Sequence, residues 1–260
     1  MLERLARLGY ASKALIFAIV GSLAIAAALG RGGRITDTSG ALRVILRNPA
    51  GRLVLLVLAV GLCGYALWRV LDAIRDPDHH GTDVKGLMTR IGNGVRAFIY
   101  GGLGIEAFRL FRGLGSSSSG DAQMWTARIM DVPAGVWIVA IGGAIIAVYG
   151  VSEIIAGLRG GYSRTLDLSP VASHLRTVAE AISRFGIGAR GVIITVLGTF
   201  LVRAGLQHDP SEAQGTRDSM LQIADIANGI WILGLVGAGL LAYAFDQALH
   251  ARYRRIKAVI

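Results

Sequence analysis

A unit of two apolar segments occurs three times along this chain of 260 residues. Each copy opens with Arg, an apolar residue and Gly, and a basic residue follows after three further positions: "RLGYASKA", "RIGNGVRA" and "RFGIGARG". In the second half of each copy a glycine precedes a longer apolar run, and a tyrosine follows that glycine by fourteen residues. Repetition of this kind predicts one structural unit used three times. We place the repeats at residues 4–76, 87–160 and 181–254 of a single domain covering residues 1–260.

The apolar runs and the composition together exclude an ordinary soluble domain. Hydrophobic residues make up 53% of the chain and charged residues only 17%, and the mean hydropathy is +0.55, which is typical of a polytopic membrane protein. The net charge of +10 does not predict a nucleic-acid partner, because the basic residues flank the apolar runs instead of gathering on one soluble face. The 36 glycines suit close helix packing in lipid.

A membrane-spanning helix needs about 20 mostly apolar residues. The apolar windows and the repeat predict an all-α transmembrane fold with six spans, at residues 10–30, 51–74, 91–112, 134–158, 186–206 and 229–250. The third and fifth windows are short when read alone, and their equivalence to the first window is the reason to count them as spans. The N-terminal segment imitates a secretory signal peptide, but we expect no cleavage because the same segment recurs twice.

The distribution of basic residues predicts the orientation of the chain. Lys and Arg are more frequent around the chain ends and the second and fourth connections than in the other three connections. By the positive-inside rule, this predicts a multi-pass protein of the bacterial inner (plasma) membrane with both termini in the cytoplasm. Each outer connection carries a short amphipathic stretch, "ALRVILRNP", "MWTARIMDVP" or "MLQIADIAN". We predict short helices there, which either lie against the outer leaflet or serve as ordinary packed connectors.

The repeated Arg-apolar-Gly pattern, the segment "NPAGR" and the run "GLCGYALWRVLDA" together resemble the bacterial membrane family catalogued as domain of unknown function 1206. The resemblance covers nearly the whole chain as three paired-span repeats. The third copy departs from it at "IANG", which lacks the proline, and the second copy has Ser152 and Glu153 where the first has Trp68 and Arg69. The resemblance implies an integral membrane protein and transfers no activity and no catalytic residue.

Charged residues inside the predicted spans are the first candidates for function, because a charge is costly to bury in lipid. They form two sets, basic residues at the starts of the odd-numbered spans and acidic residues at the ends of the even-numbered spans: Lys13, Arg96 and Arg190, and Asp72, Glu153 and Asp246. Opposite charges at matched depth predict pairs between helices, for example Lys13 with Asp72. A path for an ion or a substrate is the alternative.

Two further sets of polar residues lie within the spans. Glu106 and Arg109 are three residues apart, so they share a helix face and predict either an intrahelical pair or a proton or cation relay. The repeat-equivalent tyrosines Tyr65, Tyr149 and Tyr243 are expected to have interfacial or packing roles, with a threefold ring of hydroxyl groups as the alternative. The segment "DPDHHGTD" lacks metal-site spacing, and we expect no metal and no cofactor.

Two functions remain open from the sequence. The first is a noncatalytic membrane scaffold or partner-binding protein, and the alternative is a small transporter or channel for an ion or a small molecule. No enzyme is predicted, because no nucleophile and orienting acid occur at a recognisable spacing. The expected partners are the lipid bilayer and either a membrane protein or further copies of the chain. A water-accessible cavity that reaches the matched charges would favour transport, whereas a dry centre would favour the scaffold.

Overall fold

The computed structural model describes residues 2–33, 35–75, 84–114, 121–159, 173–213, 215–225 and 228–254. Regular structure within these ranges is helical. The elements are α1 (Leu2–Ala28), α2 (Thr38–Leu46), α3 (Gly51–Arg75), α4 (Val84–Phe111), α5 (Asp121–Met130), α6 (Gly135–Arg159), α7 (Ser173–Gln207), the single-turn η2 (Pro210–Glu212), α8 (Thr216–Asp225) and α9 (Gly229–Tyr253). Each repeat therefore consists of a long helix, a short helix and a second long helix.

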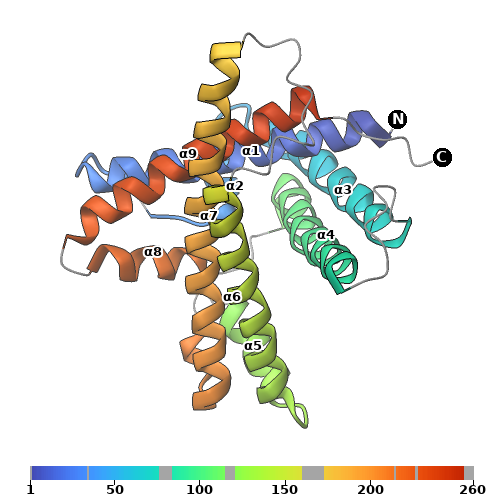
Figure 1. The fold of residues 1–260 in the computed structure, drawn as a ribbon, viewed down its shortest axis with the longest axis vertical. Helices are drawn as coiled ribbons and strands as arrows, with labels where there is room; N and C mark the ends of the chain where they lie inside the picture. The colour runs from blue at the N-terminus through green and yellow to red at the C-terminus, as the bar shows by residue number, and fades with distance from the viewer. Residues whose placement is uncertain are drawn as a thin grey trace.

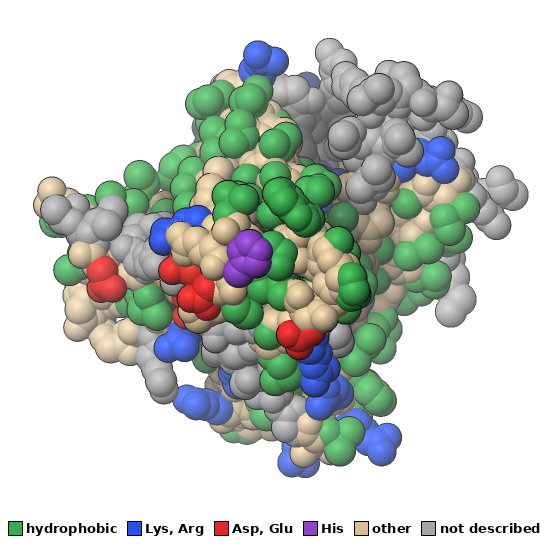
Figure 2. Space-filling model, turned by 90° about the horizontal axis from the view of Figure 1, so that it is seen from below, with side chains coloured by type: hydrophobic (Ala, Val, Ile, Leu, Met, Phe, Trp, Pro, Cys, Tyr) green, Lys and Arg blue, Asp and Glu red, His purple; other side chains and the backbone are tan. Residues whose placement is uncertain are grey.

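Five of the long helices are long and apolar enough to cross a membrane: Glu3–Ala28, Gly51–Ile74, Gly135–Arg159, His174–Gln207 and Gly229–Tyr253. They coincide with five of the six predicted spans. The remaining long helix, α4, has 28 residues but is less apolar, because Arg96 and Glu106 lie within it. Apolar side chains cover large parts of the surface drawn in Figure 2, as expected of a protein that contacts lipid.

The first helix of each repeat begins earlier than the sequence predicts. We expected starts at residues 10, 91 and 186, whereas α1, α4 and α7 begin several residues before these positions. The predicted spans begin shortly after the first arginine of each motif, but long basic side chains let a helix continue past the apolar layer with its charged turns in a polar environment. The basic residues of the first set consequently lie well inside their helices: Lys13, Arg96 and Arg190.

The six long helices associate as three pairs, each of which joins two repeats: α1 with α9, α3 with α4, and α6 with α7 (Figure 1). The pairs are inclined to one another, so that α1 and α9 run across the direction of α6 and α7. Glycine permits the close approach within a pair. A Cβ atom at Gly21 would lie 2.8 Å from the carbonyl oxygen of Gly237, and one at Gly198 would lie 2.4 Å from the backbone nitrogen of Ala147. A larger residue would force the two helices apart.

The first arginine of each repeat motif holds the same pairs together. Arg7 Nη1 donates to the carbonyl oxygens of Ala251, at 3.3 Å, and Arg252, at 2.5 Å, near the end of α9. The equivalent contacts are those of Arg90 with the carbonyls of Ala73 and Ile74, and of Arg184 with those of Gly157 and Leu158. The last carbonyl groups of a helix lack hydrogen-bond partners within the helix and form its negative end. The repeated arginine supplies both a donor for these carbonyls and a positive charge beside them.

The short helices form where the amphipathic stretches predict them. Asp37 precedes α2 as its N-cap, and its Oδ1 accepts a hydrogen bond from the Gly40 backbone nitrogen at 2.7 Å. The side chains of Ala41, Leu42 and Ile45 enter the main hydrophobic core, which lies mostly between α1, α3, α4 and α9. Of the two interpretations left open for these stretches, α2 therefore fits a packed connector.

Contacts within a repeat differ among the three copies. α1 packs on α3 and α7 packs on α9, but α4 and α6 have no comparable contact. A Cβ atom at Gly9 would lie 2.3 Å from Tyr65 Cβ, and one at Gly186 would lie 2.2 Å from the Tyr243 backbone nitrogen. The equivalent Gly92 has no atom of the described residues within 4 Å of such a Cβ position. The threefold arrangement is therefore open between α4 and α6.

Candidate functional site

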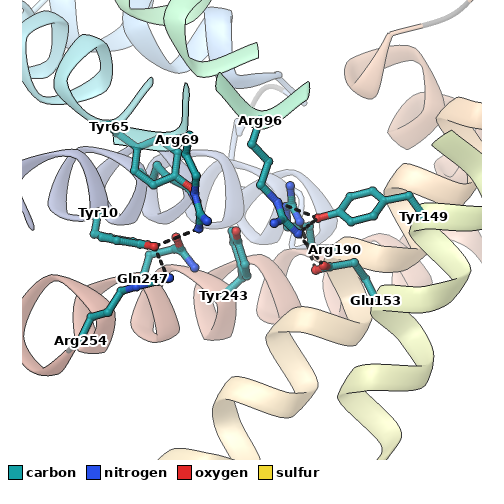
Figure 3. A pocket seen from close by; sticks show the side chains of 11 residues that line it. Tyr10, Tyr65, Arg69, Arg96, Tyr149, Glu153, Arg190, Tyr243, Gln247 and Arg254 are labelled. Atoms are coloured by element: carbon teal, nitrogen blue, oxygen red, sulfur yellow. Dashed lines mark hydrogen bonds and ion pairs between the residues drawn. The ribbon is translucent and has the colours of Figure 1, made fainter. Parts of the chain in front are cut away.

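A polar chamber lies where the three helix pairs meet (Figure 3). It is narrow, with a cavity volume of about 10 Å³, which is about the space that one water molecule needs. The lining consists of Tyr10, Lys13, Tyr65, Arg69, Arg96, Tyr149, Glu153, Arg190, Tyr243, Gln247 and Arg254. Ionisable residues inside membrane proteins usually face a partner, a ligand or a water-filled path. This chamber is therefore the candidate functional site.

Three repeat-equivalent positions build most of the chamber. The first helix of each repeat supplies a cation, from the set Lys13, Arg96 and Arg190, and the last helix supplies a tyrosine, from the set Tyr65, Tyr149 and Tyr243. The third position lies four residues after each tyrosine, one turn along the same helix face, and is occupied by Arg69, Glu153 and Gln247. The first two sets were singled out from the sequence. Of the third set only Glu153 was, although its spacing from the tyrosines is a readable signal.

Lys13 lies in a cage of tyrosines. Its Nζ is 3.4 Å from the hydroxyl oxygen of Tyr65. The same atom lies between 4.6 and 5.8 Å from the ring centroids of Tyr10, Tyr65, Tyr100 and Tyr243. Contacts of a cation with aromatic faces offset part of the cost of removing it from water. The matched depths predicted a pair of Lys13 with Asp72. In the structure Lys13 is surrounded by these rings and does not contact Asp72.

Arg69 forms one wall of the chamber. Its Nε donates to the Tyr65 hydroxyl at 2.9 Å, and its Nη2 donates to the Tyr10 hydroxyl at 3.1 Å. Its Nη1 lies 3.0 Å from both Asp72 Oδ2 and Asn93 Oδ1. Asn93 also donates to Asp72 Oδ2 at 2.9 Å. The Asp72 carboxylate is therefore paired with a guanidinium of its own helix, which explains why it is unavailable to a cation of the first set.

Two guanidinium groups share the carboxylate of Glu153. Arg96 Nη2 lies 3.4 Å from Oε1, and Arg190 Nη1 lies 3.2 Å from Oε2. Arg96 also donates to the Tyr149 hydroxyl, at 2.6 Å from Nη2 and 3.2 Å from Nε (Figure 3). These contacts join α4, α6 and α7, so charges of opposite sign do meet between helices here, with two bases on one acid.

Basic side chains outnumber acidic ones in the chamber lining by five to one. Arg69 is compensated by Asp72 behind the wall, whereas Arg254 donates to the Tyr10 hydroxyl and lies 4.7 Å from the Trp68 ring centroid. Gln247 Oε1 is buried and has no hydrogen-bond partner among the described residues. Buried charges need compensation, and this set of donors is complementary to an anion.

Asp246 takes a place behind the chamber lining. It is fully buried, its Oδ2 accepts a hydrogen bond from Gln247 Nε2 at 2.9 Å, and it lies 3.4 Å from Nδ1 of His250. The bond to Gln247 holds the amide group so that the Gln247 side chain lines the chamber. Asp246 therefore orients a lining side chain. The sequence had predicted that it pairs directly with a cation of the first set.

Glu106 and Arg109 lie outside the chamber lining. Glu106 is buried, and its Oε2 accepts a hydrogen bond from Ser39 Oγ of α2 at 2.6 Å. Arg109 is exposed on the surface of α4. The predicted intrahelical pair is not formed, because the Glu106 side chain is buried towards α2 whereas the Arg109 side chain is exposed. The segment "DPDHHGTD" lies outside the described residues, and the described part of the chain contains no cluster of three or more His, Cys, Asp or Glu placed to hold a metal ion.

Comparison with known proteins gives the family. The model of the family described as Domain of Unknown Function (DUF1206) matches three times, at residues 8–76, 91–160 and 185–254. The chain belongs to this family. Uncharacterized protein YxxB of Bacillus subtilis (strain 168) is similar to it, with 31% identity over 255 residues that cover 98% of this chain and 92% of that protein. No solved structure matches the chain. Each DUF1206 match contains at least one cation and one tyrosine of the chamber, so all three repeats contribute to the site.

Proposed function

We propose that this DUF1206 protein binds a small anion in the chamber and moves it across the membrane as a noncatalytic transporter. The observation that carries the proposal is the five basic side chains around one acidic side chain, inside the crossing of three membrane helix pairs. Guanidinium, ammonium and phenol groups are donors that match the oxygen atoms of phosphate, sulfate or carboxylate groups. An anion there offsets the repulsion among the buried cations, and Gln247 Oε1 accepts a hydrogen bond from a protonated anion.

We also propose six spans, with α4 as the sixth. The start of α1 and the end of α9 lie side by side, since Arg7 donates to the carbonyl groups of Ala251 and Arg252. Ends that meet on one side of the membrane require an even number of crossings. The five apolar helices are an odd number, and α4 supplies the missing crossing. Cytoplasmic termini in the bacterial inner membrane follow from the distribution of basic residues.

The scaffold remains the competing function, and it requires a dry, filled centre. The close glycine contacts within the helix pairs fit that requirement, because they make each pair tightly packed. The small cavity volume of about 10 Å³ also fits it. The charges of the lining do not, because five basic side chains share one acidic side chain and buried charges need compensation. That excess of donors favours a bound anion, which the chamber can admit only if side chains of the lining move. Neither a protein partner nor a further copy of the chain is needed to complete the lining.

Binding of inorganic phosphate and of sulfate to the purified protein in detergent tests the proposal. We expect both anions to raise the Tm, since a ligand that binds the folded state stabilises it. The double variant R96Q/R190Q should need at least about tenfold more phosphate for the same rise, which corresponds to about 1.4 kcal/mol. Arg109→Gln is the matched control, because Arg109 lies on the same helix but is exposed and outside the lining.

Transport is measured separately, as uptake of radiolabelled phosphate and sulfate into proteoliposomes. Uptake by the native protein and its loss in R96Q/R190Q support the proposal. A Tm that responds to neither anion, or responds equally in the double variant, overturns anion binding at this site. Binding without uptake overturns the transport step and leaves an anion-binding membrane protein.

A further inference from the structure

The opening between α4 and α6 gives the second repeat a surface that the other two repeats do not have. Ile99 of α4 is 56% exposed, whereas the equivalent residues Ile16 and Ile193 are 0% and 4% exposed. Val95, one turn earlier, is 44% exposed, and its equivalent Ser12 is 3% exposed. A helix face that is buried against a neighbour in two repeats is therefore uncovered in the third.

The sequence of α6 explains the opening. Gly61 of α3 and Gly239 of α9 let these helices approach the first helix of their own repeat, and added Cβ atoms would lie 2.4 Å from Ser12 Oγ and 2.1 Å from Ala189 Cβ. The equivalent residue of α6 is Ile145, which is 54% exposed. A β-branched side chain at this position prevents the close approach that glycine permits.

A second position of α6 also has a bulky apolar residue where α3 has a glycine. Gly64 of α3 lies against α1, where an added Cβ would be 2.9 Å from Leu5 Cβ. Val148 occupies the equivalent position in α6 and is 69% exposed. Ile145 and Val148 are three residues apart and lie on one face. Together they give the α6 border of the opening an apolar surface.

The opening leads to the chamber at Arg96. This residue follows Gly92 by four positions and precedes Ile99 by three, so it belongs to the face of α4 that borders the opening. Its side chain is 24% exposed, although the equivalent Lys13 is buried. On the other border, Tyr149 follows Ile145 by four residues and accepts the hydrogen bond of Arg96. A cationic group is thus placed at the inner end of an apolar opening.

We propose that the anion is the phosphate headgroup of an anionic phospholipid, which enters the chamber sideways from the bilayer between α4 and α6. This inference rests on the proposed function and names the substrate class. Arg96 and Arg190 bind the phosphate in exchange for part of their contact with Glu153. The acyl chains extend out of the opening along its apolar borders, formed by Val95, Ile99, Ile145 and Val148.

Charge and polarity favour a lipid over the other occupants of such an opening. A free phosphate ion matches the cations but makes no use of an apolar entrance that faces the bilayer. A second copy of the chain covers the apolar borders but leaves the chamber cations without an anion. An anionic phospholipid satisfies both parts of the surface with one molecule.

Three probes with related headgroups separate these cases: dioctanoyl phosphatidic acid, glycerol 3-phosphate and dioctanoyl phosphatidylcholine. Affinities are measured with the purified protein in detergent. We expect phosphatidic acid to bind at least about tenfold more tightly than glycerol 3-phosphate, and phosphatidylcholine to bind weakly because its headgroup has no net charge. R96Q/R190Q should lower the affinity for both anionic probes.

Gly102→Trp fills the opening, because Gly102 follows Ile99 by three residues on the same face of α4. A Cβ at Gly102 would meet no atom within 4 Å among the described residues. We expect this variant to lose the preference for phosphatidic acid and to keep its affinity for glycerol 3-phosphate. The double variant I145G/V148G gives α6 the glycines of α3 and closes the opening by another route, with the same expected loss. The control Leu67→Trp adds the same bulk at an exposed position of α3 and should change neither affinity.

The outcomes separate this inference from the proposed function. Equal affinities for phosphatidic acid and glycerol 3-phosphate, unaffected in both opening variants, overturn lateral lipid entry while anion binding stands. Absence of binding by either anionic probe counts against the proposed function itself. Disulfide formation between two chains through Ile145→Cys in a Cys63→Ala background in membranes indicates that a second copy covers the opening, and this also overturns the inference.

Discussion

Lys13 is surrounded by tyrosine rings and one close hydroxyl group, and no carboxylate forms an ion pair with it among the described residues. Aromatic faces attract a cation but replace only part of the hydration that it loses on burial. A residue retained in such a place at the expense of stability fits a binding role, since removal of binding charges commonly stabilises a protein. Lys13 therefore contributes its charge to the proposed anion site at a cost to the stability of the fold.

Lys13→Met should raise the Tm in buffers without phosphate or sulfate, because a side chain of similar length then fills the cage without a buried charge. The expected gain is about 1–3 kcal/mol of unfolding free energy. The same variant should lose most of the Tm rise that phosphate produces in the native protein. Thermal unfolding in detergent, with and without phosphate, measures both effects. A lower Tm for Lys13→Met in phosphate-free buffer would show that the ammonium group stabilises the fold.

At this scale the sequence predicts positions better than partners. The repeat alignment selects one cation and one tyrosine from every copy, and the structure brings all six together in the chamber. It does not identify the partners, because these depend on which helices pair and on which side chain reaches an acid first. Asp72 is occupied by Arg69 of its own helix and Glu106 by Ser39 of α2. Neither contact follows from spacing within one span.

The helices associate through glycines that act in two different ways. The second glycine of the motif lies in the interface between repeats in all three copies, at Gly21, Gly104 and Gly198. The first glycine lies in an interface within the repeat at Gly9 and Gly186 but faces open space at Gly92. The sequence has the same glycine in every copy. The difference becomes visible only when the second long helices of the repeats are aligned, because α6 has Ile145 at the position where α3 has Gly61 and α9 has Gly239.

Gly186→Ala and Gly92→Ala should therefore have opposite effects on stability. An added methyl group at Gly186 would lie 2.2 Å from the Tyr243 backbone nitrogen, so α7 and α9 must separate, at a cost of about 1–3 kcal/mol. At Gly92 the methyl group meets no atom within 4 Å in the described part of the chain, and the better helix propensity of Ala should stabilise α4 by about 0.5–1 kcal/mol. Unfolding of the two purified variants under identical conditions measures the difference. Equal destabilisation by both substitutions would mean that α4 and α6 are in contact in the membrane.

At the scale of the whole molecule, the three helix pairs connect the repeats in a ring that closes between the first and the last. α9 of the third repeat packs on α1 of the first, with Arg7 bound to the final carbonyl groups of α9. This closure brings the start of α1 and the end of α9 together, which under the proposed topology requires an even number of spans. Five of the long helices are apolar enough to cross a membrane. α4, the proposed sixth span, is less apolar because Arg96 and Glu106 lower its mean hydropathy.

Thiol labelling in intact cells tests the crossing of α4. In a Cys63→Ala background, single cysteines at Arg31, Leu114 and His174 report the ends of α1, α4 and α7 at exposed positions. With six spans and cytoplasmic termini, a membrane-impermeant maleimide should label the cysteines at positions 31 and 114 and spare the one at position 174. If α4 does not cross, every later connection changes sides, so the cysteine at position 174 becomes labelled and the one at position 114 is protected. That reversed pattern would also separate the start of α1 from the end of α9 and contradict the ring closed by Arg7.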